Sequence, residues 1–382
     1  MPLSAFPGLV PTFAAEWHLS NTEAGWISGV YYLGYMLVVP FLMSATDRVD
    51  AKRVFLAGAA ISAATAFGFA WSADGFWSAF VWRALAGVGL AGTYMPGLKA
   101  LTDRNATVNQ SRGVVLYTGS YSVGVGVSFL VAGSVADALG WRAAFVAVGI
   151  GPLLAGALVL LALTPKPPAS RRNMRELLDF RPVFRNRAAL GYIFAYGAHC
   201  YELMAMRAWI VAFAGYAVAR SADVSSLVTP TGIATAVTLI GMPASIIGNE
   251  GSIRFGRRRT VLTVMIVSIG VALAVGAAAA APLWLVVALI ALHAVTIAGD
   301  SGSITAGTVG AATPEAQGAT MAVHSTIGFG TSFLGPLVIG VALDHAGGSA
   351  SASGWLAAYA VMALGTMLGP LALWLCRERR AA

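Results

Sequence analysis

Long apolar runs recur along nearly the whole chain, and they limit what it can fold into. Each run of about 18 to 25 residues is long enough to cross a hydrocarbon core of about 30 Å as a helix. Polar and apolar residues do not alternate within the runs, which excludes a membrane β-barrel. Only 10% of the residues are charged and the mean hydropathy is +0.75, so the chain is not an ordinary water-soluble globule. We therefore predict an all-α membrane protein.

The runs form two groups of six predicted transmembrane helices. The first group is a short apolar start up to Phe13 and the spans 22–44, 54–73, 76–98, 113–136 and 142–163. The second group is 189–216, 227–248, 260–280, 283–311, 317–342 and 354–375. This pattern predicts an N-terminal six-helix bundle over residues 1–163, a central loop over 164–188 and a C-terminal six-helix bundle over 189–382.

Lysine and arginine collect in alternate loops. Of the 24 such residues, only Arg142 and Arg220 lie in the opposite loops, and only Arg83 and Arg207 lie within spans. Short cytoplasmic loops hold the excess of positive charge, so we expect the central loop and the C-terminus to be cytoplasmic. This placement also accounts for the net charge of +8 without a nucleic-acid partner. The excess of arginine over lysine fits a bacterial inner membrane.

The two halves of the chain repeat each other. Gly133 and Asp137 have counterparts of the same type 207 residues later. Independently, the loop 47–53 aligns with 253–259 at an offset of 206. Two separate landmarks therefore indicate one internal duplication.

The same offset leaves part of the second half without a counterpart. It places the first residue opposite Arg207 or Ala208, so 189–207 has nothing to pair with. The first span then lacks roughly 18 residues, and the dozen or so that remain are too few to cross a bilayer. We expect a first helix truncated at the N-terminus by a start codon assigned too far downstream.

Two equivalent loops carry a recognisable motif of charged residues and glycine. In the first loop Met43 and Asp50 stand where the motif has glycines, and in the second loop Ile253 replaces its acid and Asn249 its first glycine. The residues that fit are Asp47, Arg48, Lys52 and Arg53 in the first loop, and Arg254, Gly256, Arg258 and Arg259 in the second.

With Arg83, Gly87 and Gly89 in the fourth span, these loops make the chain resemble the major facilitator superfamily over almost its full length. The resemblance implies two six-helix bundles that rock about a central site. It also implies a cytoplasmic gate, in which Asp47 and its basic neighbours latch the outward-facing state. The fifth span lacks the Gly-Pro pair of the family's antiporter signature, so the motifs do not support an exporter.

Ionisable residues within spans are candidate sites, because each is costly in hydrocarbon unless it is paired or hydrated. The candidates for a substrate and proton pathway are Glu202, Arg207, Arg83, His199, Asp300 and His324. Glu202 lies about 20 Å into its helix, near the bilayer centre, and is the main candidate for a proton carrier. A structural hydrogen bond to a neighbouring helix is the alternative. His199 shares the face of Glu202 and could relay the proton or orient the acid.

Arg207 and Arg83 could bind a carboxylate or a similar anion from the two halves of the protein. The alternative is that both side chains extend to water at the membrane surface. Asp300 lies in a stretch of small residues, where it could be a second acid or form a packing hydrogen bond.

His293, His324 and Glu202 do not form a predicted metal site, because they lie on different spans without ligand spacing. No nucleophile elbow or phosphate loop occurs, so we expect neither an enzyme nor a cofactor. We expect a monomeric, proton-coupled carrier of a small organic solute, preferentially an anion, that works by alternating access in the lipid bilayer. A multidrug exporter is the first alternative, since Glu202 or Asp300 could attract lipophilic cations. A non-transporting sensor or partner subunit is the alternative from another class.

Overall fold

The computed structural model describes residues 2–104, 110–166, 180–221, 228–313 and 316–376. The chain folds into two compact units, Met1–Leu19 with Trp26–Met174 and Ser20–Gly25 with Arg175–Ala382. Within the expected central loop, residues 167–179 lie outside the described residues, as do the basic C-terminal residues 377–382.

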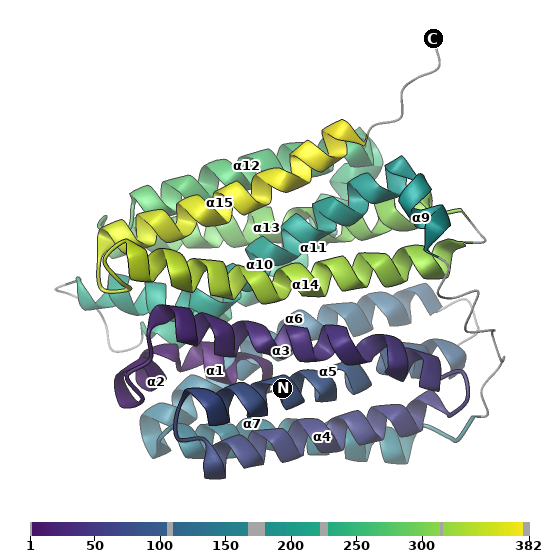
Figure 1. The fold of residues 1–382 in the computed structure, drawn as a ribbon, viewed down its shortest axis with the longest axis horizontal. Helices are drawn as coiled ribbons and strands as arrows, with labels where there is room; N and C mark the ends of the chain where they lie inside the picture. The colour runs from purple at the N-terminus through teal and green to yellow at the C-terminus, as the bar shows by residue number, and fades with distance from the viewer. Residues whose placement is uncertain (1, 105–109, 167–179, 222–227, 314–315, 377–382) are drawn as a thin grey trace. The chain divides into compact units, whose positions relative to one another are not determined.

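Helices account for the secondary structure of the described residues in both units (Figure 1). The first unit holds η1 (Pro2–Ser4), α1 (Ala5–Gly8), α2 (Val10–Glu16), most of α3 (Asn21–Ala45), α4 (Ala51–Ser72), α5 (Phe76–Arg104), α6 (Gln110–Leu139) and α7 (Trp141–Ala162). The second unit holds α9 (Arg181–Arg185), α10 (Arg187–Ala219), α11 (Pro230–Phe255), α12 (Arg257–Ala277), α13 (Leu283–Ala311), α14 (Gln317–His345) and α15 (Ala352–Leu375).

Ten helices in the described ranges are long and apolar enough to cross a membrane. An eleventh long helix, α5, has 29 residues and packs against α4. The predicted spans agree with the observed helices except at their ends: α5 continues to Arg104 and α11 to Phe255, because charged and polar turns prolong the helix beyond its apolar part. The prediction of an all-α membrane fold is therefore confirmed.

The first predicted span, up to Phe13, consists of the short helices η1, α1 and α2. Its aromatic rings are part of the core of the first unit. Phe6 and Phe13 are fully buried and stack with 5.1 Å between ring centroids, and both contact Phe69 of α4 edge-on. Aromatic burial therefore holds these short helices in place.

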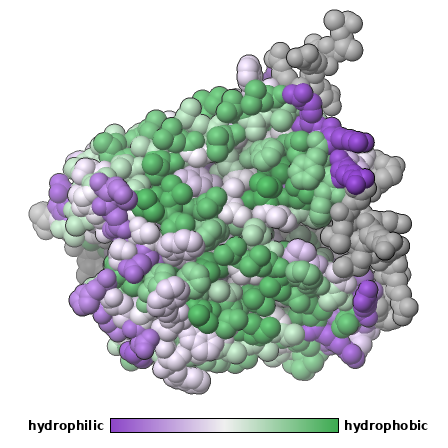
Figure 2. All heavy atoms as spheres, in the orientation of Figure 1, coloured by the Kyte–Doolittle hydropathy of each residue, from purple (hydrophilic) through white to green (hydrophobic). Residues whose placement is uncertain are grey.

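Large apolar side chains on the outside of each unit face the surroundings. On α7 the exposed fractions of Leu154, Leu158 and Leu161 are 60%, 67% and 84%, and on α15 Leu364 and Leu368 are each 62% exposed. Figure 2 shows hydrophobic residues along the middle of the helices and hydrophilic residues gathered toward their ends. Such a surface suits lipid rather than water, as expected for a multi-pass membrane protein.

Short polar side chains fix where several helices begin. Asp50, Asn186 and Ser351 each accept a hydrogen bond from a backbone N–H in the first turn of α4, α10 and α15. Gly256, with φ of 90°, separates α11 from α12 without continuing the helix. These caps satisfy backbone groups that a membrane cannot hydrate.

Asp344 explains why Ser20–Gly25 groups with the second unit. Its two carboxylate oxygens accept hydrogen bonds from the backbone N–H groups of Asn21 at 3.0 Å and Thr22 at 2.8 Å. The first turn of α3 is thereby capped by a carboxylate from the end of α14.

Small residues let α4 and α5 approach closely. A Cβ atom added to Gly58 would lie 2.6 Å from the carbonyl carbon of Gly92 and 2.7 Å from its α-carbon. Because these contacts are with backbone rather than with a movable side chain, the two helices would have to separate to accept it.

The substitution Gly58→Ala tests this close approach. We expect it to reduce the free energy of unfolding in detergent by about 1 to 3 kcal/mol, because overpacking forces the backbone to shift. Gly270→Ala in α12 is the matched control, since its Cβ would meet nothing within 4 Å, and it should be neutral or slightly stabilising. Equal stability of the two variants in a thermal unfolding assay would contradict the packing described.

Candidate functional site

Glu202 of α10 lies in a polar cluster inside the second unit. Its Oε1 atom accepts a hydrogen bond of 2.8 Å from the Ser268 hydroxyl of α12 and lies 2.9 Å from Nε2 of His293 on α13. Thr296 contacts the Ser268 hydroxyl at 3.0 Å. Glu202 is 1% exposed and His293 is fully buried, so this carboxylate interacts with protein groups rather than with bulk water.

A second carboxylate–imidazole pair joins the same two helices. Nδ1 of His199 on α10 lies 2.7 Å from Oδ1 of Asp300 on α13, and both residues are 2% exposed. The contact is close but is not aligned as a hydrogen bond, which leaves both atoms without one in the described part of the chain. The sequence pairs His199 with Glu202 on its own helix, but in the structure His199 contacts Asp300 instead.

We call these two contacts the crossed pairs, because α10 supplies the imidazole of one pair and the acid of the other. His199 and Glu202 lie one turn apart on α10, and each meets a partner of the opposite kind on α13, where His293 and Asp300 lie two turns apart. Each helix thus supplies one acid and one imidazole. The two contacts therefore join α10 to α13 through two acid–imidazole pairs of opposite direction.

His324 of α14 extends the cluster toward a third helix. Its ring stacks on Tyr196 with 3.7 Å between centroids, and Tyr196 in turn lies 6.0 Å from the ring of His199. Nδ1 of His324 lies 3.2 Å from the Thr308 hydroxyl. The structure therefore brings four of the predicted pathway residues, Glu202, His199, Asp300 and His324, into one region of the second unit.

His293 adds a third atom of this cluster that has no hydrogen bond within the described residues, besides His199 Nδ1 and Asp300 Oδ1. Nδ1 of His293 is buried and has no hydrogen-bond partner among the described residues, while the Tyr359 ring lies 5.9 Å away. Buried polar atoms are nearly always paired in native proteins, so these atoms distinguish the cluster from the rest of the buried core.

The two predicted arginines lie in different units. Arg207 is partly buried on α10, beyond Glu202 in the chain. Arg83 of α5 is only 2% exposed, so the alternative in which it extends to water is wrong for this residue. Its guanidinium contacts the carbonyl oxygens of Pro2 and Leu3 at 3.4 and 3.3 Å and lies 4.4 Å from the Tyr31 ring centroid. These neutral partners stabilise a buried cation without neutralising it.

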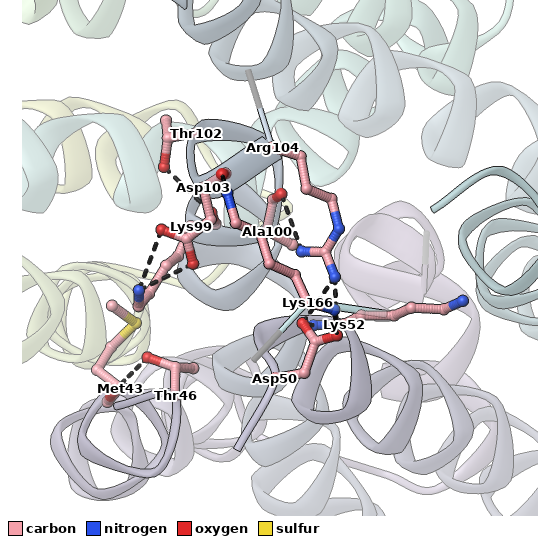
Figure 3. Close-up of polar contacts among 10 residues, drawn as sticks. All are labelled: Met43, Thr46, Asp50, Lys52, Lys99, Ala100, Thr102, Asp103, Arg104 and Lys166. Carbon is pink, nitrogen blue, oxygen red and sulfur yellow. Dashed lines mark hydrogen bonds and ion pairs between the residues drawn. The ribbon is translucent and has the colours of Figure 1, made fainter. Parts of the chain in front are cut away.

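A second charged cluster surrounds Asp50 in the first unit (Figure 3). Nη2 of Arg104 lies 2.8 Å from both carboxylate oxygens, and the backbone N–H groups of Lys52 and Lys166 donate at 2.9 and 2.8 Å. Burial raises the pKa of Asp50, but these hydrogen bonds outweigh it and hold the pKa below its usual range. Asp50 is therefore a charged anchor at the start of α4.

The motif acid Asp47 is placed differently from Asp50. Its side chain makes no hydrogen bond or ion pair with the residues that the structure describes. The motif treats Asp50 only as a departure from a glycine, so sequence reasoning misses the ion pair of Asp50 with Arg104. The position of Asp50 just before an apolar run, typical of a helix cap, is the signal that could have found it.

Lys52 and Arg258 occupy equivalent positions in the two halves and make equivalent contacts. Nζ of Lys52 donates to the carbonyl oxygens of Leu160 and Leu163 at the end of α7, the first of these at 2.9 Å. Nη2 of Arg258 donates to Leu373 at the end of α15, also at 2.9 Å. Each motif cation thus caps the C-terminal end of the last long helix of its unit.

The remaining motif residues are at or near the surface. Arg48, Arg53, Arg254 and Arg259 are exposed, and the Arg254 guanidinium lies 5.3 Å from the ring of Phe255. Gly256 supplies the turn between α11 and α12. Their part in a gate stays a prediction.

Comparisons with known proteins support the family resemblance. The model of the Major Facilitator Superfamily matches residues 1–249. "Uncharacterized MFS-type transporter YcaD" of Salmonella dublin and the protein of the same name from Escherichia fergusonii are each 29% identical to this chain over 150 residues. That match covers 38% of this chain, and the chain spans 39% of the length of each relative.

Solved structures with the same fold cover nearly the whole chain. A bacterial homolog of the human lysosomal transporter Spinster, in an inward-facing and occupied conformation, has a TM-score of 0.69 at 16% identity over 100% of this chain and 96% of that one. The nucleoside transporter NupG has a TM-score of 0.71 at 15% identity over 99% of this chain and 98% of that one. At these identities the likeness shows the fold.

The pairing of Asp50 with Arg104 can be tested by a double-mutant cycle. Asp50→Asn keeps a side chain that caps a helix well but removes its charge. With Arg104→Gln we expect a coupling energy of about 1.5 to 3 kcal/mol near neutral pH, because both side chains are largely buried. The control cycle at the more exposed pair Lys99 and Asp103 should give about 0.3 to 0.5 kcal/mol.

The same pair predicts a pH dependence with a defined sign. Because the folded pKa of Asp50 is lowered, its contribution to stability is present above the ordinary carboxyl pKa and is lost as pH falls through the lower, folded value. The stability difference between the parent protein and Asp50→Asn should therefore shrink on acidification. A difference that is constant with pH in thermal unfolding would contradict this account.

Proposed function

Because the chain belongs to the Major Facilitator Superfamily, we propose that it carries a small organic solute across the membrane by alternating access, coupled to proton movement. The family and the fold are those of transporters rather than enzymes. The curated relatives match over only part of their length, so the solute has to be inferred from the residues of this chain.

The crossed carboxylate–imidazole pairs are the observation that carries proton coupling. Glu202 and Asp300 are each about 2% exposed or less within membrane-spanning helices. An ionisable group is energetically costly there, so such groups are rare and mark functional sites. Each acid has an imidazole within 3 Å that can share its proton. A proton that enters or leaves this set changes the attraction between α10 and α13, and it can thereby bias the conformation of the second unit.

The buried charge of Arg83 supports an anionic solute. Its guanidinium contacts carbonyl oxygens and aromatic rings, and no ion pair links it to an acid in the described residues. Arg207, one to two turns from Glu202 on the same helix, is the candidate cation of the second unit. Arginine suits a carboxylate because its planar fork can donate two parallel hydrogen bonds.

The basic loops support an orientation with the central loop and the C-terminus in the cytoplasm of a bacterial cell, at its inner membrane. In this orientation the Asp50 cluster lies on the cytoplasmic side of the first unit. We assign this cluster, together with Asp47 and its exposed basic neighbours, to the cytoplasmic gate. Asp50 and Arg104 are the members that this proposal adds to the motif residues, because they form the ion pair of the cluster.

A thermal-shift screen of the purified protein tests the solute class. The panel contains small organic carboxylates, nucleosides and lipophilic cations, because a bound solute stabilises the folded state. We expect carboxylates to raise the Tm, and Arg207→Ala or Arg83→Gln to abolish the increase. In the parent protein we expect this increase in Tm to change with pH, because solute binding is coupled to proton binding. In Glu202→Gln the increase should be the same at every pH.

Controls separate loss of binding from loss of folding. Each variant should elute as a single species and keep a cooperative thermal transition before it is compared. Stabilisation only by lipophilic cations, removed by Glu202→Gln, would replace the anion carrier by a multidrug exporter. Stabilisation only by nucleosides, unaffected by either arginine variant, would contradict the anionic solute.

A further inference from the structure

An open apolar groove lies on the surface of the first unit and begins beside the Asp50 cluster, at Val49 and Arg53. It has a volume of about 270 Å³ and lies between α3, α4 and α5. Arg53, Ala57 and Ile61 follow one face of α4 at intervals of four residues, and Leu42 of α3 and Val88 of α5 form its sides. The groove therefore runs along α4 for about two turns, or roughly 12 Å.

Glycine gives this groove its depth. Gly58 and Gly92 line it and bring the backbones of α4 and α5 together without side chains that would fill the space. Ile61 is 38% exposed and Val49 is 40% exposed, so the groove opens to the outside of the unit. Its walls are almost entirely apolar, with one exception at the end where α4 begins.

That exception is Arg53, which is exposed and lies in the first turn of α4. Within the described chain its guanidinium makes no hydrogen bond or ion pair. The neighbouring Arg48 is also exposed and unpaired there, whereas Asp50 is neutralised by Arg104. Asp47 is the remaining acid of this loop, which leaves a net positive charge at the head of the groove.

We propose that this groove binds a phospholipid with an anionic headgroup. Helix α4 has 22 residues, about 33 Å at 1.5 Å per residue, so its first turn reaches the level of the lipid headgroups when it spans the membrane. The phosphate contacts Arg53 and Arg48, and one acyl chain lies along Ala57 and Ile61. Basic side chains at the membrane surface attract anionic lipids, and a recess below them selects a lipid over a free anion.

The occupant is a lipid chain because of the position and chemistry of the groove. It descends from a cationic rim into the apolar part of the helix, which matches the order of headgroup and tail in a lipid. A soluble anion would leave the apolar walls empty, and a partner helix would need a longer and flatter face.

Lipid titration of the delipidated full chain in detergent tests the site. We compare phosphatidylglycerol with phosphatidylcholine of the same acyl chains, using native mass spectrometry to count bound lipids and thermal shift to measure stabilisation. The parent protein should bind phosphatidylglycerol in preference. Arg53→Gln should weaken that binding about fivefold, the effect of one cation near a lipid surface.

Matched variants distinguish lipid binding in this groove from the general electrostatic attraction of anionic lipids to a basic protein. Arg259→Gln removes the exposed arginine at the equivalent position of the second half, outside the groove, and should leave the high-affinity adduct unchanged. Ala57→Phe fills the groove from its exposed side and should reduce binding of both lipids. Ala60→Phe, also exposed on α4 but outside the groove, should not.

Two results would overturn the proposal. One is equal binding of the two lipids to the parent protein. The other is an equal effect of Arg53→Gln and Arg259→Gln, which would assign the preference to the total charge rather than to this groove. Because Arg53, Ala57, Ala60 and Arg259 are all exposed, the variants are expected to fold, and a cooperative thermal transition checks this.

Discussion

The crossed pairs between α10 and α13 are the interaction on which the second unit depends. Four ionisable side chains, His199, Glu202, His293 and Asp300, are almost wholly buried in helices that span the membrane. Ionisable groups are tolerated in such a place only while each keeps its partner, and removing one partner of a buried ion pair costs about 3 to 5 kcal/mol. The packing of α10 against α13 therefore includes these two polar contacts.

The two halves of the chain share some physical roles and differ in others. Lys52 and Arg258 cap the ends of α7 and α15 from equivalent positions, so the motif cations of both halves satisfy carbonyl groups that the membrane cannot hydrate. Asp50 with Arg104 belongs to the first half, and Ile253 replaces the motif acid in the second. The crossed pairs, in turn, belong to the second half. A motif cation thus caps a helix in both halves, whereas the Asp50–Arg104 pair lies in the first half and the crossed pairs lie in the second.

The helices can be predicted from the sequence because a membrane imposes a minimum apolar length. Hydropathy alone places the spans, and the family motifs supply the fold that the comparisons confirm. Helix ends are less predictable, since α5 continues to Arg104 and α11 to Phe255, beyond the apolar stretches that hydropathy detects.

The pairing within the site cannot be predicted in the same way. His199 and Glu202 share a face of α10, which suggests that they act on each other. Their partners are instead decided by the rotation and register of α13, which no local pattern encodes. The sequence shows His293 as an ionisable residue within a span and as a metal ligand rejected on spacing, but it does not predict that the ring contacts Glu202. The role of Asp50 as a helix cap is likewise missed when the loop is compared with the motif, because the motif has a glycine at this position.

Accumulation of the stabilising solute in proteoliposomes, with and without a pH gradient, tests the central claim most directly. The parent protein should concentrate the solute only when a gradient is present. Glu202→Gln should still exchange solute across the membrane but should not concentrate it, because the proton site is lost while the solute site remains. Gradient-driven accumulation by Glu202→Gln equal to that of the parent protein would contradict a role for the crossed pairs in proton coupling.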